Sequence, residues 1–460
     1  MQTDRVLGLQ DLGWLQFERL CGLLLQTESG IAPEAWEGSA DQGRRLVSRE
    51  PVRFAGRTLV PPVVVRCAWL RGSAVERRAR LEWLAAGGGP LVDEGESMLF
   101  AGLPGPDPPP PGWPPTRMLL FNGDSATLAP QSHDGFLAAG EAEILAAIDR
   151  HPEVRLALPP VLALRPEPAL NGSTLDLEAA RRLAEVFVPT AAYERALATL
   201  RRHHFAVLTG PPEMGKTAIA RMISLALLDD GWEAHECTRP EQVYERLDPG
   251  RRQVFVADDA FGSTEYRPDA AERWARELDR ILRSTGEHTW LIWTSRPAPL
   301  RAGLRAIHRE RGGERFPQPA EVQVDASALG VDEKTLILFR HARAAGLTGG
   351  ERRRMIECGE AIVGHPHFTP ERIRRFVARG VPDFDIEAEL AEPTEAMAAS
   401  YAALGEEHRE LLLAMLDCPP GPVAERDLAV ALRRHATSPL PKAPAELVDR
   451  LADHFLRVIA

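Results

Sequence analysis

The sequence predicts an α/β protein with more than one domain, in which a parallel β-sheet with intervening helices forms the central domain. Three observations predict this. The chain has 460 residues, enough for about three domains with separate cores. Short apolar runs alternate with amphipathic segments between residues 190 and 330, the order expected of a parallel sheet. A glycine-containing loop joins one of these runs to a helix-like segment at Ala218–Leu228.

Composition and charge exclude several classes of protein. Apolar residues make up 44% of the chain and charged residues 26%, as in an ordinary globular protein. The formal net charge of −11 argues against binding of nucleic acid by the whole surface. The five cysteines are scattered without a C-x-x-C pair, the N-terminus does not resemble a signal peptide, and no apolar run approaches ~18 residues. We therefore expect a cytoplasmic protein without a membrane partner.

The first domain is expected to span residues 1–170. Helical spacing of apolar residues predicts a helix at 12–27, and β-rich runs predict strands at 63–69 and 118–121. The proline-rich stretch at 103–115 predicts a surface loop, because proline removes backbone donors and fixes φ. A further helix is predicted at 141–151.

Helix, strand, loop and strand in this order resemble the start of a PD-(D/E)xK nuclease domain of the Mrr-like restriction type. In that family an Asp and a Lys on adjacent strands serve a Mg²⁺ site that cleaves phosphodiesters. This sequence departs from the pattern, because Arg45 stands where the Asp would be, and Arg66 and Ala68 stand where the Gln and Lys would be. An arginine at a metal-ligand position repels Mg²⁺.

The positions of the lysines also indicate that the first domain lacks the lysine of the nuclease pattern. The chain has 55 Lys and Arg residues but only three lysines, and the first of them is Lys216. We expect a nuclease-like fold without nuclease activity that contacts a DNA or protein partner. Two alternatives stay open: an unrelated small α/β domain, and an ATP-dependent, type IV-like restriction nuclease that acts on DNA with a metal site at Glu18 and Asp41.

The segment from Gly210 to Thr217 reads GPPEMGKT and matches the phosphate-binding loop pattern G-x-x-x-x-G-K-[ST] between a strand and a helix. Its glycines let backbone N–H groups face a phosphate at a helix N-terminus. Lys216 is expected to reach the β- and γ-phosphates, and the Thr217 hydroxyl is expected to bind Mg²⁺. The predicted nucleotide-binding residues of this P-loop are Gly210, Pro211, Pro212, Glu213, Met214, Gly215, Lys216, Thr217 and Ala218.

Two further apolar runs end in polar side chains that suit phosphate chemistry. The run at 253–259 ends in Asp258, predicted to hold Mg²⁺, and Asp259, predicted to position or activate the attacking water. The run at 289–296 ends in Arg296, which we expect beside the P-loop and in contact with the γ-phosphate. A polar turn after a strand and an arginine paired with a surface carboxylate are the alternatives. With β-like runs at 232–238 and 320–325, a parallel sheet of about five strands is predicted.

Pro189 and Thr190 precede an amphipathic helix at 192–203 and lead to the P-loop strand. This position suits contact with the base of a nucleotide. The alternative is that Thr190 is only the N-cap of that helix.

The runs F-V-P-T, H-F-A-V-L-T-G-P-P-E-M-G-K-T, V-A-D-D-A-F-G and T-S-R resemble the STAND class of signalling NTPases, in particular its third novel group, found in bacterial conflict systems. The resemblance covers about residues 185–380. It implies an ATP-operated switch in antiviral defence. The implied organisation is a linker at 171–186, an NTPase core at 187–326, a helical lid at 327–384 and a winged-helix-like domain at 385–460.

Two later segments extend the resemblance. Gly364-His365-Pro366 resembles the proline-bearing lid turn of such switches, which implies that Pro366 packs on the adenine and that His365 lies near the phosphates. A purely structural turn is the alternative. The arginine-rich stretch at 351–379 is expected to be a solvated helix surface. Helices are predicted at 396–404, 407–416, 425–432 and 445–458.

We therefore expect an enzyme that binds ATP or ADP with Mg²⁺ and hydrolyses ATP slowly. ATP favours an open, self-assembling form and ADP a closed one, through differential affinity for the two states. The predicted catalytic residues are Lys216, Asp259 and Arg296, and the predicted metal ligands are Thr217 and Asp258. The alternative is a module that holds nucleotide without turnover.

Overall fold

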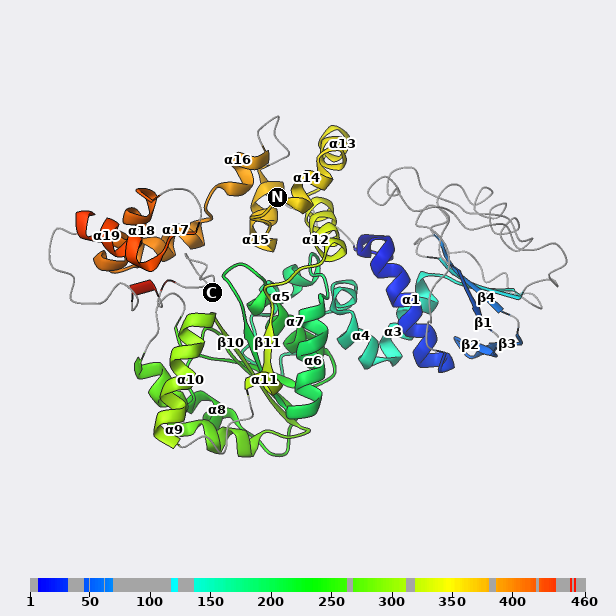
Figure 1. Cartoon of the computed structure of the whole chain (residues 1–460). Helices are drawn as coiled ribbons and strands as arrows, with labels where there is room; N and C mark the ends of the chain where they lie inside the picture. Colours follow the sequence, from blue (N-terminus) through cyan, green and yellow to red (C-terminus); the bar gives the residue numbers. More distant parts are fainter. Residues whose placement is uncertain are drawn as a thin grey trace. The chain divides into compact units, whose positions relative to one another are not determined.

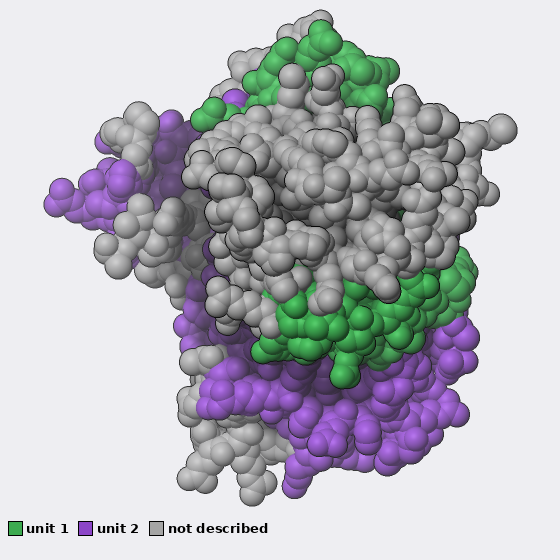
Figure 2. Space-filling model, turned by 90° about the vertical axis from the view of Figure 1, so that its right-hand side faces the viewer, with its two compact units in different colours: residues 1–168, 181–188, 339–360 green, residues 169–180, 189–338, 361–460 purple. Residues whose placement is uncertain are grey.

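The structure is a computed structural model that describes residues 7–31, 45–48, 50–61, 63–68, 117–122, 136–262, 268–311, 319–379, 386–418, 422–435, 447–448 and 451. It divides into two compact units, coloured separately in Figure 2. Unit 1 comprises residues 1–168, 181–188 and 339–360, and unit 2 comprises 169–180, 189–338 and 361–460. The predicted loop at 103–115 and the candidate ligand Asp41 lie outside the described residues.

In its described residues, unit 1 contains a four-stranded sheet in the order β1-β4-β5-β6, in which β1 is antiparallel to β4 and the other neighbours are parallel. The strands are β1 (Arg45–Ser48), β4 (Val63–Ala68), β5 (Arg117–Asn122) and β6 (Phe136–Ala139), with a separate hairpin of β2 (Val52–Phe54) and β3 (Arg57–Leu59). The described helical segments are η1 (Leu9–Leu12), α1 (Trp14–Ser29), α3 (Glu141–Arg150), α4 (Pro152–Ala157), η4 (Pro159–Leu164) and α5 (Leu177–Ala184), the last divided between the units. The strands and helices predicted in this part of the chain are confirmed within a few residues.

Helix α1 forms because its apolar side chains recur at helical spacing and share one face. Phe17, Leu20 and Leu24 are fully buried in the core of unit 1. The helix ends at Gly30, whose φ of 71° gives a left-handed cap with its N–H bonded to the Gln26 carbonyl. The predicted helix at 12–27 is therefore shifted by two residues at each end.

A buried arginine holds the N-terminal segment of unit 1. The Arg340 guanidinium donates to the backbone carbonyl of Asp11 over 2.5 Å and to that of Ala184 over 3.1 Å. Burial lowers the pKa of Arg340 to about 10. Arg343, one turn further along, pairs with the Asp11 carboxylate at 3.2 Å. Arg340 and Arg343 lie in the part of α12 (Val331–Ala344) that belongs to unit 1.

Unit 2 contains a fully parallel five-stranded sheet in the order β11-β7-β10-β9-β8. Its strands are β7 (Phe205–Thr209), β8 (Glu233–Cys237), β9 (Gln253–Ala257), β10 (Thr289–Ser295) and β11 (Gln323–Asp325). The predicted five-stranded parallel sheet is confirmed. One strand is shorter than predicted, because residues 319–322 form the helical turn α11 (Pro319–Val322) before β11 begins.

Every residue of β7, β9 and β10 is buried, so helices cover both faces of the sheet. On one face, alternate strand residues such as Phe205, Phe255 and Trp293 share a core with α8 (Glu241–Arg246), α9 (Pro268–Ser284) and α10 (Pro297–Arg311). Figure 1 shows these three helices gathered on the same side. Trp293 meets the rings of Phe205, Phe261 and Trp274 edge-on, with centroids 5.1–5.2 Å apart. Helix α7 (Lys216–Asp229) also packs on the sheet, and α6 (Ala191–His203) packs beside β7 and β11.

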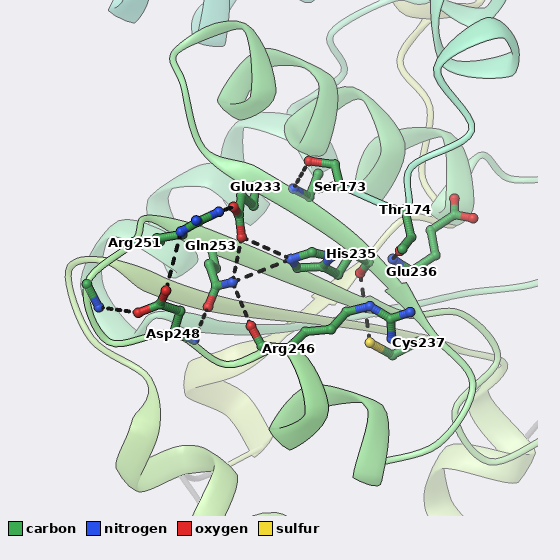
Figure 3. A network of polar contacts seen from close by, with 12 residues as sticks. Ser173, Thr174, Glu233, His235, Glu236, Cys237, Arg246, Asp248, Arg251 and Gln253 are labelled. Carbon is green, nitrogen blue, oxygen red and sulfur yellow. Dashed lines mark hydrogen bonds and ion pairs between the residues drawn. The ribbon is translucent and has the colours of Figure 1, made fainter. Parts of the chain in front are cut away.

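The outer edge of the sheet, strand β8, is covered by the start of the predicted linker. The Thr174 N–H donates to the Ala234 carbonyl over 2.9 Å. In return, the Ser173 and Thr174 hydroxyls each accept a β8 backbone N–H over 3.0 Å. Figure 3 shows both side chains beside the strand. This cover satisfies backbone groups that an edge strand would otherwise expose.

The rest of the chain is helical. The described helices are α13 (Gly349–Glu357), α14 (Gly359–Gly364), α15 (Pro370–Ala378), α16 (Ile386–Ala391), α17 (Glu395–Ala402), α18 (Glu406–Leu416) and α19 (Glu425–His435). Those predicted at 396–404, 407–416 and 425–432 are confirmed, whereas that at 445–458 lies almost entirely outside the described residues. No helix in the described ranges is both long and apolar enough to cross a bilayer.

Candidate functional site

The P-loop leaves the buried strand β7 and turns into α7 through three residues with positive φ. These are Gly210 (141°), Glu213 (67°) and Gly215 (85°). At Gly210 an added Cβ would lie 3.3 Å from the backbone nitrogen of Ser327, so both the conformation and the space favour glycine there. Gly215 is the N-cap of α7, and none of the described side chains caps it. The first N–H groups of α7 therefore suit an anion.

Lys216 is buried at the start of this helix, 8% exposed. Its Nζ donates to the carbonyls of Gly210 and Pro211 over 2.9 and 2.7 Å. Burial lowers the pKa of Lys216 to about 8, although the nearby carboxylate of Asp259 opposes the shift. A buried ammonium that gains stability from negative charge is well placed to bind phosphate oxygens.

Thr217, in the first turn of α7, and Asp258, directly after β9, lie close together. The Thr217 hydroxyl donates to Asp258 Oδ1 over 2.9 Å. Thr294 at the end of β10 donates to the same oxygen over 2.5 Å, and its hydroxyl accepts the N–H of Asp259 over 2.9 Å. Thr294 therefore fixes both aspartates. Its part was not predicted from the sequence, because it depends on β10 lying between β7 and β9.

Asp259 and Arg296 form the charged part of the site. Asp259 has a φ of 46°, a left-handed conformation that aspartate adopts more readily than most residues. Burial and the neighbouring Asp258 raise the pKa of Asp259, whereas Arg296 and Lys216 lower it. Burial lowers the pKa of Arg296, and the carboxylates of Asp259 and Glu213 oppose this shift. The predicted position of Arg296 beside the P-loop agrees with the register, in which Ser295 pairs with Thr209.

A cavity of about 420 Å³ opens beside the P-loop. Its walls come from the P-loop, the segment after β11, the start of α12, the turn before α15 and α17: Pro211, Pro212, Glu213, Met214, Ser327, Ala328, Leu329, Lys334, Pro366, His367, Phe368, Thr369, Arg372 and Met397. Lys334 lies 5.3 Å from the centroid of the Phe368 ring, and its Nζ donates to the Val363 carbonyl. The volume lies within the range of small-molecule sites.

Of the four residues outside the P-loop that were predicted to contact the base or the phosphates, one lines this cavity and three do not. Pro366 lines the cavity. His365 is buried, and its Nδ1 accepts the N–H of His367 within the turn. Thr190 is the N-cap of α6, its hydroxyl accepting the N–H of Tyr193 over 3.4 Å, and Pro189 beside it is buried. His365, Pro189 and Thr190 are not among the described residues that line the cavity.

Residues 187–344 match the family model of novel STAND NTPase 3. This segment contains the P-loop, both aspartates and Arg296 in the arrangement described above. The chain contains a STAND-type P-loop NTPase domain.

Three solved structures are similar to this chain at low identity. A Walker-type ATPase of Pyrococcus abyssi has a TM-score of 0.38 and 11% identity, covering 58% of this chain and 89% of its own. The FIGL-1 AAA domain in complex with ADP has a TM-score of 0.26 and 18% identity, covering 51% and 87%. The replication initiator DnaA bound to AMPPCP and single-stranded DNA has a TM-score of 0.28 and 12% identity, covering 58% of this chain and 88% of its own. No curated protein matches the chain.

In unit 1, the register pairs Arg45 of β1 with Arg66 of β4. The two positions at which a nuclease of the Mrr-like type would place site residues therefore face each other across one strand pair. Glu18, the remaining described candidate ligand, lies in α1 and is 4% exposed.

Proposed function

We propose that the chain is an ATP-binding switch that hydrolyses ATP slowly. The observation that carries this is the convergence of Lys216, the Thr217–Asp258 pair and Asp259 on one glycine-bounded loop. Lys216 binds the β- and γ-phosphates, and Arg296 stabilises negative charge on the γ-phosphate. Asp259, whose pKa is raised by burial, accepts a proton from the attacking water or orients it.

The donor set at Thr217 and Asp258 fits Mg²⁺. One hydroxyl and one carboxylate oxygen lie 2.9 Å apart, and Mg²⁺ prefers oxygen ligands from one or two protein side chains together with phosphates and water. When bound, the ion would neutralise charge on the β- and γ-phosphates. Thr294 keeps the Asp258 carboxylate oriented through its hydrogen bond.

The test of this function separates binding from turnover. Lys216→Ala should lose ATP binding, because the ammonium that binds the β- and γ-phosphates is removed. Asp259→Ala should bind ATP but release phosphate about 100-fold more slowly. Equal phosphate release by wild type and Asp259→Ala would favour a module that holds nucleotide without turnover. Tight ATP binding by Lys216→Ala would contradict the whole site.

Switching is proposed from the cavity beside the P-loop. Its walls include both the loop and helices that follow the NTPase core, so a change at the phosphates reaches those helices directly. ADP favours a closed arrangement and ATP an open one that self-assembles, in the cytoplasm and in the setting of antiviral defence. Light scattering with ADP and then with a non-hydrolysable ATP analogue should give a larger particle with the analogue. The same size with both would contradict assembly.

We further propose that residues 1–170 form a nuclease-like domain without nuclease activity, which contacts DNA or a protein, and that residues 385–460 form a winged-helix-like domain. The pairing of Arg45 with Arg66 supports the loss of the metal site, because arginines there oppose Mg²⁺. No cleavage of plasmid DNA with Mg²⁺ is expected. Cleavage that is present in wild type and lost in Asp41→Ala would contradict this and favour a restriction nuclease.

A further inference from the structure

Glu213, the fourth residue of the P-loop, is an unusual occupant of its position. Its φ of 67° is a left-handed conformation that glycine adopts freely and a residue with a side chain does not. Its side chain is nonetheless buried, 5% exposed. A strained, buried carboxylate in a functional loop indicates that its side-chain contacts compensate for the strain.

The contacts of Glu213 are with the capping residues of two helices. Thr369 is the N-cap of α15 and Thr394 is the N-cap of α17, and each hydroxyl accepts a backbone N–H of its own helix over 3.2 Å. Each hydroxyl also donates to the Glu213 carboxylate: Thr369 to Oε2 over 3.3 Å, and Thr394 to Oε1. One carboxylate therefore lies at two helix N-termini, where negative charge is stabilised.

Arg372 supplies the balancing charge. Its Nε lies 3.9 Å from Glu213 Oε2, and the arginine side chain is 7% exposed. The same guanidinium donates to the Leu390 carbonyl and lies 3.3 Å from the Met397 sulfur through Nη2. Arg372 is thus fixed among the helices that follow the core, and Glu213 is the P-loop group that pairs with it. A buried carboxylate needs such a partner.

We propose that Glu213 holds α15 and α17 against the P-loop and thereby slows nucleotide exchange. We call these contacts of Glu213 the latch, and their effect on nucleotide exchange the gate. Glu213, Thr369, Arg372 and Met397 all line the cavity beside the P-loop, so a ligand in the cavity lies against the residues that join the loop to these helices. The gating rests on the proposed nucleotide-binding function. The latch itself does not, because its contacts are within the chain.

The latch is tested by hydrogen exchange of the full chain without nucleotide. In Glu213→Gln, which keeps the size of the side chain but not its charge, amides of α15 and α17 should exchange about tenfold faster, equivalent to ~1.4 kcal/mol. Glu213→Gly, which also relieves the strained φ, should show the same change. The matched control is Glu371→Gln, which removes a carboxylate from an ion pair with Arg374 on the surface of α15. Exchange in either Glu213 variant equal to wild type, or to the control, would overturn the latch.

The gate is tested by the dissociation rate of a fluorescent ADP analogue. Release from Glu213→Gln should be about tenfold faster than from wild type and from Glu371→Gln. Unchanged release from a variant whose helices exchange faster would overturn the gate. If wild type binds no ADP, the proposed function fails, while the exchange result decides the latch independently.

Discussion

The Thr217 hydroxyl donates a hydrogen bond to the Asp258 carboxylate over 2.9 Å, which ties the first turn of α7 to the end of β9. The two residues are 41 positions apart in the sequence. Both oxygens suit Mg²⁺. Thr294, at the end of β10, holds the Asp258 oxygen through a second hydrogen bond. Substitutions of Thr217 can therefore test whether turnover needs the hydroxyl oxygen or only the shape of the side chain.

Thr217→Val should abolish Mg²⁺-dependent turnover while leaving the fold intact. Valine has nearly the shape of threonine but lacks the oxygen, so the proposed ion loses a ligand and Asp258 loses a hydrogen bond. Phosphate release at saturating Mg²⁺ should fall about 100-fold or more. Thr217→Ser keeps the hydroxyl and should stay within a few-fold of wild type. Turnover by Thr217→Val at the wild-type rate would exclude the proposed metal role.

The pKa of Lys216 gives a prediction about pH. Burial lowers this pKa to about 8, so the ammonium is half neutral near pH 8 before phosphate binds. Phosphate charge favours the protonated form, so ATP binding at pH 8.5 should take up about three quarters of a proton. Affinity should be highest below pH 8 and should weaken as pH rises, by up to about tenfold per unit.

Titration calorimetry in two buffers of different ionisation enthalpy measures this uptake. The control is Lys216→Arg, which stays charged at every accessible pH and should show no uptake from this position wherever its binding is measurable. Equal binding enthalpies for wild type in both buffers at pH 8.5 would mean that Lys216 is already charged before ATP arrives.

The sequence predicted the P-loop, the two aspartates and Arg296 because each lies directly after a buried strand. Each of these residues follows its strand within a few positions in the sequence. Because parallel strands end at the same edge of the sheet, the sequence order alone predicts that Lys216, Asp258 and Arg296 lie close together. The lengths of strands were less predictable. Residues 320–322 look apolar enough for β11, but Pro319 fits the first turn of a helix.

The partners of Glu213 could not be predicted in this way. Thr369 and Thr394 lie 156 and 181 positions further along the chain. Each reads from sequence only as a helix cap, and nothing in its local pattern indicates a second hydrogen bond to the P-loop. Such contacts depend on how α15 and α17 pack on the core, which requires the three-dimensional structure.

Trp293→Ala should destabilise the NTPase sheet strongly. The indole is fully buried and meets three aromatic rings edge-on, and it directly precedes Thr294. Removal of a buried Trp costs about 3–5 kcal/mol through lost burial and the cavity left behind. Hydrogen exchange of β7, β9 and β10 amides measures the loss within this unit. Val331→Ala, at a side chain 69% exposed, should leave the same amides unchanged within about 0.5 kcal/mol.

Acid should loosen the β8 edge of the sheet before it affects the centre. Gln253 donates to Glu233 over 2.8 Å, Arg251 pairs with Glu233, and His235 lies 3.5 Å from the same carboxylate (Figure 3). Burial lowers the pKa of His235, more than Glu233 raises it. Burial raises the pKa of Glu233, but the hydrogen bonds from Arg251 and Gln253 outweigh it and the pKa is lowered.

Because both pKa values are lowered on folding, the unfolded edge binds more protons, and stability must fall as pH falls. The histidine contribution is complete above its ordinary pKa of about 6.5 and is lost below it, and the Glu233 contribution is lost below about 4.5. Protection factors of β8 amides, corrected for intrinsic exchange, should therefore decline between pH 7 and 5. His235→Gln should remove the decline over this range, whereas wild-type protection that stays constant to pH 5 would show that His235 titrates alike in both states.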